Sequence, residues 1–181
     1  EGRTAEAARG YEALRVQAIP VSRELAWKCA LRFARVKLGG HDVEGALPLF
    51  EEVIGARLET SEDVAAEAYN GRGRCRFAKG QLLAERSRKS TEPAKLASLQ
   101  DEALAEFRAA RLDFLRVIVS YPNVQGQQAE ALYWAAQAFL VIVAFGALTQ
   151  AYVTSDFSVA NVVANSHSAK PMLYKISGVW G

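Results

Sequence analysis

Apolar residues recur every three or four positions through the first part of the chain, a spacing typical of amphipathic helices. Two such helices follow one another, with apolar positions at Leu25, Cys29, Phe33 and Val36, and then at Val43, Ala46, Leu47, Phe50, Val53 and Ile54. The residues between them, Gly39-Gly40-His41-Asp42, supply a glycine stop for the first helix and an aspartate cap for the second. The pattern therefore predicts a tight helical hairpin.

A third helix is expected after Thr60-Ser61-Glu62-Asp63, where a hydroxyl and a carboxylate can satisfy the first free backbone N–H groups. It is predicted to run through Phe77, with an extension beyond Gly80 left open, ahead of a polar stretch from Glu85 to Glu92. A fourth helix begins at Pro93 and ends near Tyr121-Pro122. Its apolar face comprises Leu96, Leu99, Ala103, Phe107, Ala110, Phe114 and Val117. We expect an all-α fold without a sheet.

Charged residues are distributed very unevenly along the chain. Residues 140–181 contain only Asp156, Lys170 and Lys175, and no charge occurs between Glu130 and Asp156. The apolar segment Ala131 to Val153 is long enough to cross a bilayer, for which roughly 20 residues suffice. The alternative is a buried core helix that is apolar on every side. We favour a membrane helix, followed by a polar loop.

The overall charge and the cysteines exclude several classes of function. A net charge of +2 is too small to hold a nucleic acid over the whole surface, so no nucleic-acid partner is expected. Cys29 and Cys75 have no CxxC companion, which argues against a zinc site or a disulfide framework. We interpret both as small buried helix residues.

The sequence predicts no catalytic residue, no cofactor and no metal site. Only two histidines occur, His41 and His167, and neither can be combined with a nucleophile into a catalytic group with confidence. His167 could be proposed as a haem or metal ligand, but a hydrogen-bonded loop histidine is favoured because no ligand cluster accompanies it. The protein is therefore not expected to be an enzyme.

Basic residues gather on one predicted helical face, at Arg72, Arg76 and Lys79. We take these three as the candidate partner-binding residues, with Arg86, Arg88 and Lys89 following them in the chain. Such a patch could contact an acidic peptide or lipid headgroups. The alternative is a solvated face, since surface charge runs are common.

Small and aromatic residues at fixed offsets resemble the tetratricopeptide repeat family over about residues 22–139. The first-helix pattern is Ala66-Glu67-Ala68-Tyr69 with Gly73, Phe77 and Gly80, the second-helix pattern is Ala110, Phe114, Val117 and Pro122, and Ala129-Glu130-Ala131 opens another first helix. The pattern Ala46, Phe50 and Val53 precedes Ala110 by 64 positions, which predicts an insertion near Leu82 to Leu99. The resemblance implies antiparallel helix pairs and a groove that binds a peptide or protein.

A second resemblance covers about residues 140–181. It is carried by Phe145 to Val153, Ser155 to Val159, Asn165 to Ser168, and Pro171 to Gly181. These clusters resemble the cytochrome c-type biogenesis family that forms the membrane haem lyase subunit. The resemblance implies a membrane helix with an extracytoplasmic loop, and cytochrome c maturation components as possible partners.

Together these patterns predict a helical-repeat scaffold at residues 1–139 and a membrane segment at residues 140–181. The expected function is protein–protein interaction at a bacterial inner membrane, connected to cytochrome c maturation. If the apolar helix does not insert, a cytoplasmic or periplasmic location is expected. The alternative is a truncated or chimeric haem lyase subunit joined to an unrelated helical partner.

Overall fold

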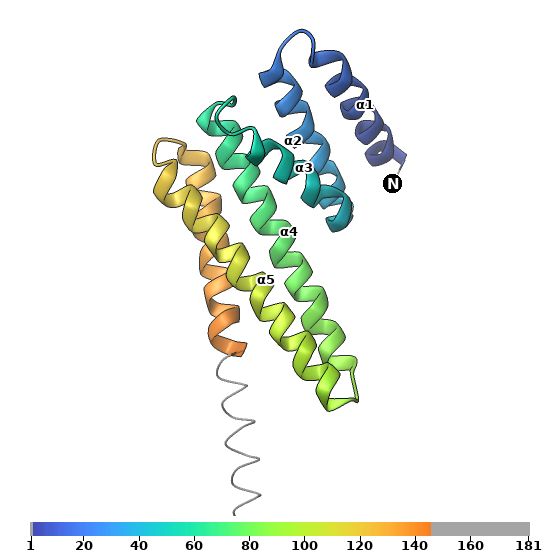
Figure 1. Ribbon diagram of the computed structural model, residues 1–181, viewed down its shortest axis with the longest axis vertical. Coiled ribbons are helices and arrows are strands. Elements are labelled where there is room, and N and C mark those ends of the chain that lie inside the picture. The colour runs from blue at the N-terminus through green and yellow to red at the C-terminus, as the bar shows by residue number, and fades with distance from the viewer. Residues whose placement is uncertain (1, 146–181) are drawn as a thin grey trace, which may run out of the picture. The chain divides into compact units, whose positions relative to one another are not determined.

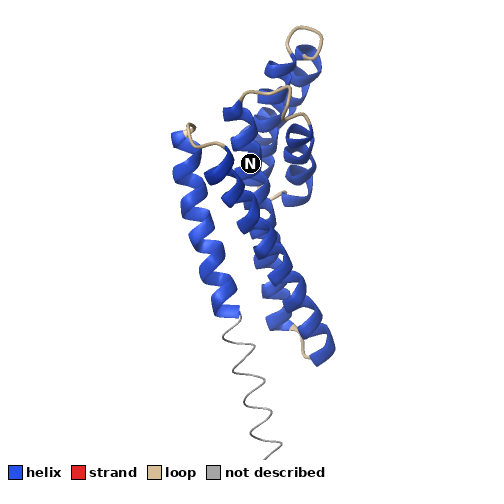
Figure 2. Cartoon of the chain, turned by 60° about the vertical axis from the view of Figure 1, so that its left-hand side comes forward, coloured by secondary structure: helices blue, strands red, loops and turns tan. Residues whose placement is uncertain are grey.

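The computed structural model describes residues 2–145, and every regular element in that part of the chain is a helix (Figures 1 and 2). The elements are α1 (Gly2–Ala18), α2 (Arg23–Gly39), α3 (Val43–Gly55), α4 (Glu62–Lys89) and α5 (Pro93–Ser120), followed by a helix at Gln125–Phe145. The all-α prediction is confirmed. The predicted polar loop, with His167, lies outside the described residues.

Consecutive helices pack against one another from α1 to α5, and α2 also contacts α4 (Figure 1). The sequence pattern did not predict α1. The hairpin of α2 and α3 was predicted, and the carboxylate of Asp42 caps α3 by accepting a hydrogen bond of 2.9 Å from Gly45 N–H. The helix α2 ends at Gly39 as expected, but the left-handed residue of the turn is His41, with a φ of 63°.

The helix α4 is the centre of the bundle. It runs beyond Gly80, the extension that the sequence left open, and ends at Lys89, because Leu83, Ala84 and Ser87 are buried and continue the packing. The predicted hydroxyl cap at its start is wrong, since Ser61 makes no side-chain cap hydrogen bond. The helix begins instead with Glu62 and Asp63, whose negative charges suit a helix N-terminus.

Glycines on α4 allow aromatic rings of the neighbouring helices to approach its backbone. A Cβ added at Gly73 would lie 2.6 Å from Cε1 of Phe114, and one at Gly80 would lie 2.9 Å from Cε1 of Phe107. Gly71 faces the ring of Phe50 on α3 in the same way. These small residues thus set the distance between α4 and its neighbouring helices.

The helix Gln125–Phe145 is the one helix among the described residues that is long and apolar enough to cross a membrane, and most of its side chains are not buried. It lies alongside α4 and α5 through Trp134, whose ring is 5.3 Å from Phe77 and 6.4 Å from Phe114 between centroids. The chain divides into two compact units at Ile142/Val143. The domain boundary that the change in composition suggested at residue 139 stays a prediction.

Candidate protein-binding groove

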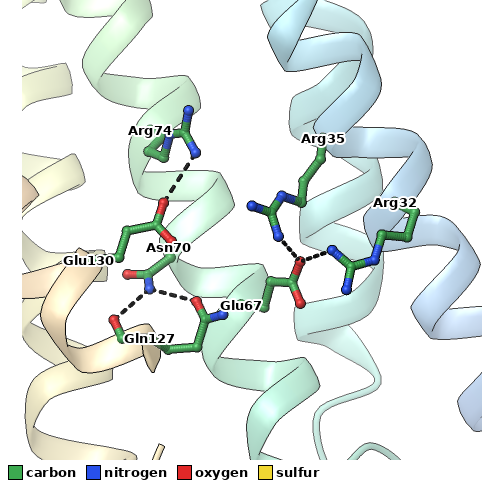
Figure 3. A network of polar contacts seen from close by, with 7 residues as sticks. All are labelled: Arg32, Arg35, Glu67, Asn70, Arg74, Gln127 and Glu130. Atoms are coloured by element: carbon green, nitrogen blue, oxygen red, sulfur yellow. Dashed lines mark hydrogen bonds and ion pairs between the residues drawn. The ribbon is translucent and has the colours of Figure 1, made fainter. Parts of the chain in front are cut away.

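One face of α4 carries three polar residues. One of them contacts α2, and the other two contact the helix Gln125–Phe145. Residues Glu67, Asn70 and Arg74 are spaced at three and four positions, so they point in nearly the same direction. Figure 3 shows Glu67 directed toward α2, and Asn70 and Arg74 directed toward the helix Gln125–Phe145. We call this surface the polar face of α4. It lies between α2 and the helix Gln125–Phe145, and its residues Glu67 and Asn70 are buried.

On the α2 side, two arginines share a single carboxylate. Oε1 of Glu67 accepts hydrogen bonds from Arg32 at 3.4 Å and from Arg35 at 2.7 Å (Figure 3). The Glu67 side chain is 11% exposed, whereas the side chains of Arg32 and Arg35 are 53% and 43% exposed. One negative charge therefore faces two positive charges. The excess positive charge is accessible to an anionic group.

On the opposite side, the polar face is paired with the helix Gln125–Phe145. Nδ2 of Asn70 donates to the backbone oxygen of Gln127 at 2.8 Å and to its Oε1 at 2.9 Å. Arg74 donates to Glu130 at 3.1 Å and lies 5.5 Å from the centroid of the Trp134 ring. Oδ1 of Asn70 is buried and has no hydrogen-bond partner. This helix therefore satisfies most, but not all, of the polar groups that it covers.

The same face of α4 continues into an open pocket of about 490 Å³. The pocket is lined by His41, Val43, Ala78, Gln81, Leu82 and Glu85. A hydrogen bond from Lys89 lowers the pKa of Glu85, so its carboxylate is ionised at the pocket. The apolar side chains of Val43 and Leu82 lie beside these polar groups. The pocket can thus accept an amphipathic side chain next to the polar face.

The three residues predicted to bind a partner lie on the other side of α4. Arg72 and Arg76 both donate to the buried carboxylate of Asp113 on α5, at 2.5 Å and 3.1 Å for the closest pairs, and Lys79 pairs with Glu106 at 2.5 Å. The structure thus brings all three into ion pairs with α5. Their role in partner binding is not tested by this geometry and stays a prediction.

The sequence pattern did not mark as site residues Arg32, Arg35, Glu67, Asn70 or Arg74. A usable signal was present, since Glu67 and Asn70 interrupt a run of small and apolar residues in which every position from Val64 to Gly71 is buried. Polar residues inside such a run need partners from neighbouring helices. The identity of those partners, however, depends on packing that the sequence does not show.

The described residues hold no group of three or more His, Cys, Asp and Glu side chains that could bind a metal ion. Cys29 and Cys75 are both buried and unpaired, as the sequence suggested. Burial raises the pKa of the Cys75 thiol to about 12, so this cysteine is not a reactive nucleophile at neutral pH.

Comparison with known proteins gives short but close matches to one group. The chain is 63% identical over 46 residues to the cytochrome c-type biogenesis protein ccl1 of Rhodobacter capsulatus. It is 56% identical over 61 residues to CycK of Rhizobium meliloti, and 56% identical over 48 residues to CcmF of Pseudomonas aeruginosa, both also named cytochrome c-type biogenesis proteins. These matches cover 25%, 33% and 26% of this chain.

The chain spans less than a tenth of the length of these relatives, between 7% and 9%. No protein-family model matches the chain, and no solved structure does. The resemblance to cytochrome c-type biogenesis proteins is therefore confirmed for a part of the chain. The resemblance to tetratricopeptide repeats is not shown by these comparisons and stays a prediction.

Proposed function

We propose that this protein is a helical scaffold that binds an acidic, extended segment of a partner protein along the polar face of α4. The observation that supports this most strongly is the arrangement of Arg32 and Arg35 around Glu67, with more positive than negative charge at an accessible position. An acidic side chain of the partner would pair with the surplus guanidinium group. The pocket beside Val43 and Leu82 would hold a neighbouring apolar side chain.

We further propose that the scaffold works at a bacterial inner membrane and takes part in cytochrome c maturation. The support is twofold: the partial match to cytochrome c-type biogenesis proteins and the one candidate membrane helix of the described chain. The membrane segment Ala131 to Val153 would hold the scaffold near the partner. The partner would be another component of the maturation machinery.

The test is the content of c-type cytochromes in the host bacterium. Deleting the gene should lower haem-stained c-type cytochromes, and the wild-type gene should restore them. The variant Arg32→Glu/Arg35→Glu should fail to restore them, because it reverses the charge of the groove. The matched control Arg23→Glu/Lys28→Glu changes two exposed basic residues of the same helix and should restore them. Equal rescue by both variants would argue against the groove.

A second candidate is a fragment of a haem lyase subunit joined to an unrelated helical partner. It is favoured by identity of 56–63% confined to a quarter to a third of the chain. The two candidates differ in what the host makes. A continuous transcript and one polypeptide across Ile142/Val143 would support the scaffold, whereas two separate products would support the second candidate.

A further inference from the structure

We propose that the helix Gln125–Phe145 has two alternative positions, docked on α4 and α5 or inserted in a bilayer, and that insertion uncovers the polar face of α4. This inference rests on the proposed function, because it concerns the membrane attachment and the regulation of the same groove. In the docked position this helix acts as an internal competitor for the binding face.

Docking and insertion require the same residues. Ala131 and Ala138 are fully buried at 0% exposure, and Trp134 packs on Phe77 and Phe114. The charge-free segment that could cross a bilayer also begins at Ala131. If the turns from Ala131 to Ala138 stay docked, only the charge-free residues Phe139 to Ser155 are left to cross the bilayer. These are 17 residues, the lower limit of the roughly 17–25 that a span needs.

The register of the packed helices makes simultaneous docking and spanning unfavourable. Gln127 contacts Asn70 from 57 positions later in the chain, and Glu130 contacts Arg74 from 56 positions later, so the two helices run parallel. Phe139 therefore lies level with Leu82. Since a helix rises about 1.5 Å per residue, α4 extends about 10 Å beyond that level before it ends at Lys89.

The end of the α4–α5 hairpin carries more positive than negative charge. Its exposed basic residues are Arg86, Arg88, Lys89 and Lys95, against the carboxylates of Glu92 and of Glu85, which pairs with Lys89. A bilayer whose hydrocarbon began at Phe139 would surround these charges, which is costly for lysine and arginine. A helix that spans the bilayer must therefore leave α4 and α5, or the hairpin must enter the lipid. Release of the helix avoids burying the four charges.

In the docked position the helix Gln125–Phe145 exposes apolar side chains, and α4 keeps one buried oxygen atom without a hydrogen bond. Leu132, Phe139, Leu140 and Val143 are each more than half exposed, although they form an apolar stripe along one helix. Oδ1 of Asn70 is buried without a partner beneath the same helix. Insertion would cover the apolar stripe with lipid and would let Asn70 bind water or a partner.

Release has a direct consequence for the groove. Gln127 and Glu130 would withdraw from Asn70 and Arg74, whose amide and guanidinium groups would become free. An acidic segment of the partner could then pair with Arg74 as well as with Arg32 and Arg35. Partner binding and membrane insertion would favour each other, and by linkage the coupling would be equal in both directions.

The test uses the full chain with Trp27 and Trp180 changed to Phe, which leaves Trp134 as the one tryptophan. The protein is reconstituted into phosphatidylcholine vesicles that contain a headgroup-nitroxide lipid, and Trp134 fluorescence is measured. In the docked position Trp134 lies level with Phe77, which is 12 residues or about 18 Å along α4 from Lys89 at the end of that helix. Trp134 would then lie far from the headgroup nitroxides, and little quenching is expected. In the inserted position it lies near the headgroups, and strong quenching is expected.

Two matched variants shift the equilibrium in a defined way. Ala138→Leu adds bulk in the docked contact, whereas Ala136→Leu makes the same change at an exposed position of the same helix. Ala138→Leu should increase the quenched fraction severalfold at low lipid, and Ala136→Leu should leave it near wild type. Glu130→Lys, which breaks the pair with Arg74 without overpacking, should act like Ala138→Leu.

Carbonate extraction of the same vesicles separates the two proposals. Retention in the membrane with quenching of Trp134 supports the alternative positions. Retention with unquenched Trp134 would show that the helix spans while docked, which would overturn the inference but leave the membrane attachment intact. Full release by carbonate would overturn the attachment, and the inference with it.

Discussion

The side-chain amide of Asn70 donates two hydrogen bonds to one residue, Gln127, at the backbone oxygen and at Oε1. Asn70 is 1% exposed, so these bonds are shielded from water and join α4 to the helix Gln125–Phe145. The bonds position that helix along α4 and set its register, in which Phe139 lies level with Leu82.

Replacing Asn70 with Ala should destabilise the protein by about 1–3 kcal/mol, because α4 loses both side-chain hydrogen bonds to Gln127. The measurement is urea unfolding of the full chain in mild detergent, followed by circular dichroism. Gln81→Ala is the control, since Gln81 is exposed on the same helix. A control effect as large as that of Asn70→Ala would contradict the role of the pair.

Gly73→Ala should cost about 1–3 kcal/mol, because the new methyl group would meet the ring of Phe114 at 2.6 Å. Gly10→Ala is the matched control, as nothing lies within 4 Å of its added Cβ in the middle of α1. There the change should stabilise by about 0.5–1 kcal/mol through helix propensity. Opposite signs for the two substitutions are the expected outcome of thermal unfolding.

Arg72→Ala should destabilise by about 1.5–3 kcal/mol, because it removes one of the two guanidinium groups from the buried carboxylate of Asp113, with which Arg76 still pairs. Lys79→Ala should cost less than about 1 kcal/mol, since Lys79 is 49% exposed. Urea unfolding compares the two. If Arg72→Ala leaves stability unchanged and weakens partner capture, the sequence-based assignment of this residue to partner binding would be preferred over a structural role.

The buried thiol of Cys75 predicts a loss of stability at high pH. Its pKa is raised to about 12 from an ordinary value of 9.0, so the folded state holds the proton more tightly than the unfolded state does. This contribution is fully present below about pH 9 and decreases as the pH rises toward 12, by up to about 1.4 kcal/mol per pH unit.

The measurement for Cys75 is the difference in unfolding free energy between wild type and Cys75→Ala as a function of pH. The unfolding free energy of the wild type minus that of the variant should be constant from about pH 6 to 8. It should decrease between about pH 9 and 12, because only the wild type carries the buried thiol. Iodoacetamide should modify Cys75 only after unfolding. Modification of Cys75 in the folded protein at pH 7 would contradict its burial.

The hairpin and the aromatic core were predictable from the sequence because they follow helical periodicity. Phe50, Phe77, Phe107 and Phe114 are all buried, and each lies on a regular apolar stripe or at a position that the repeat pattern marked. The helix α1 was missed because its Ala-, Glu- and Arg-rich sequence has no clear apolar stripe. It packs mainly on α2, and Arg15 on α1 also forms an ion pair with Glu52 on α3.

The polar face of α4 could not be read from the pattern, for a different reason. This helix is enclosed by several others, so buried positions run all round it instead of along one stripe, and Glu67 and Asn70 look like surface residues in the sequence. Arg72 and Arg76 were likewise interpreted as a surface patch, because their partner Asp113 comes from α5, 37 to 41 positions away. Local spacing does not show such long-range pairs.

Site-specific photocrosslinking tests whether the partner binds along the polar face of α4. A benzophenone amino acid at Gln81, which is exposed and lines the pocket beside that face, is compared with one at Leu112, which is 62% exposed on α5. Both full-length variants are irradiated in host membranes, and the products are identified by mass spectrometry. We expect a cytochrome c maturation protein to be crosslinked from position 81 and not from position 112. Crosslinking of that protein from position 112 alone, or equally from both, would show that the partner does not bind along this face.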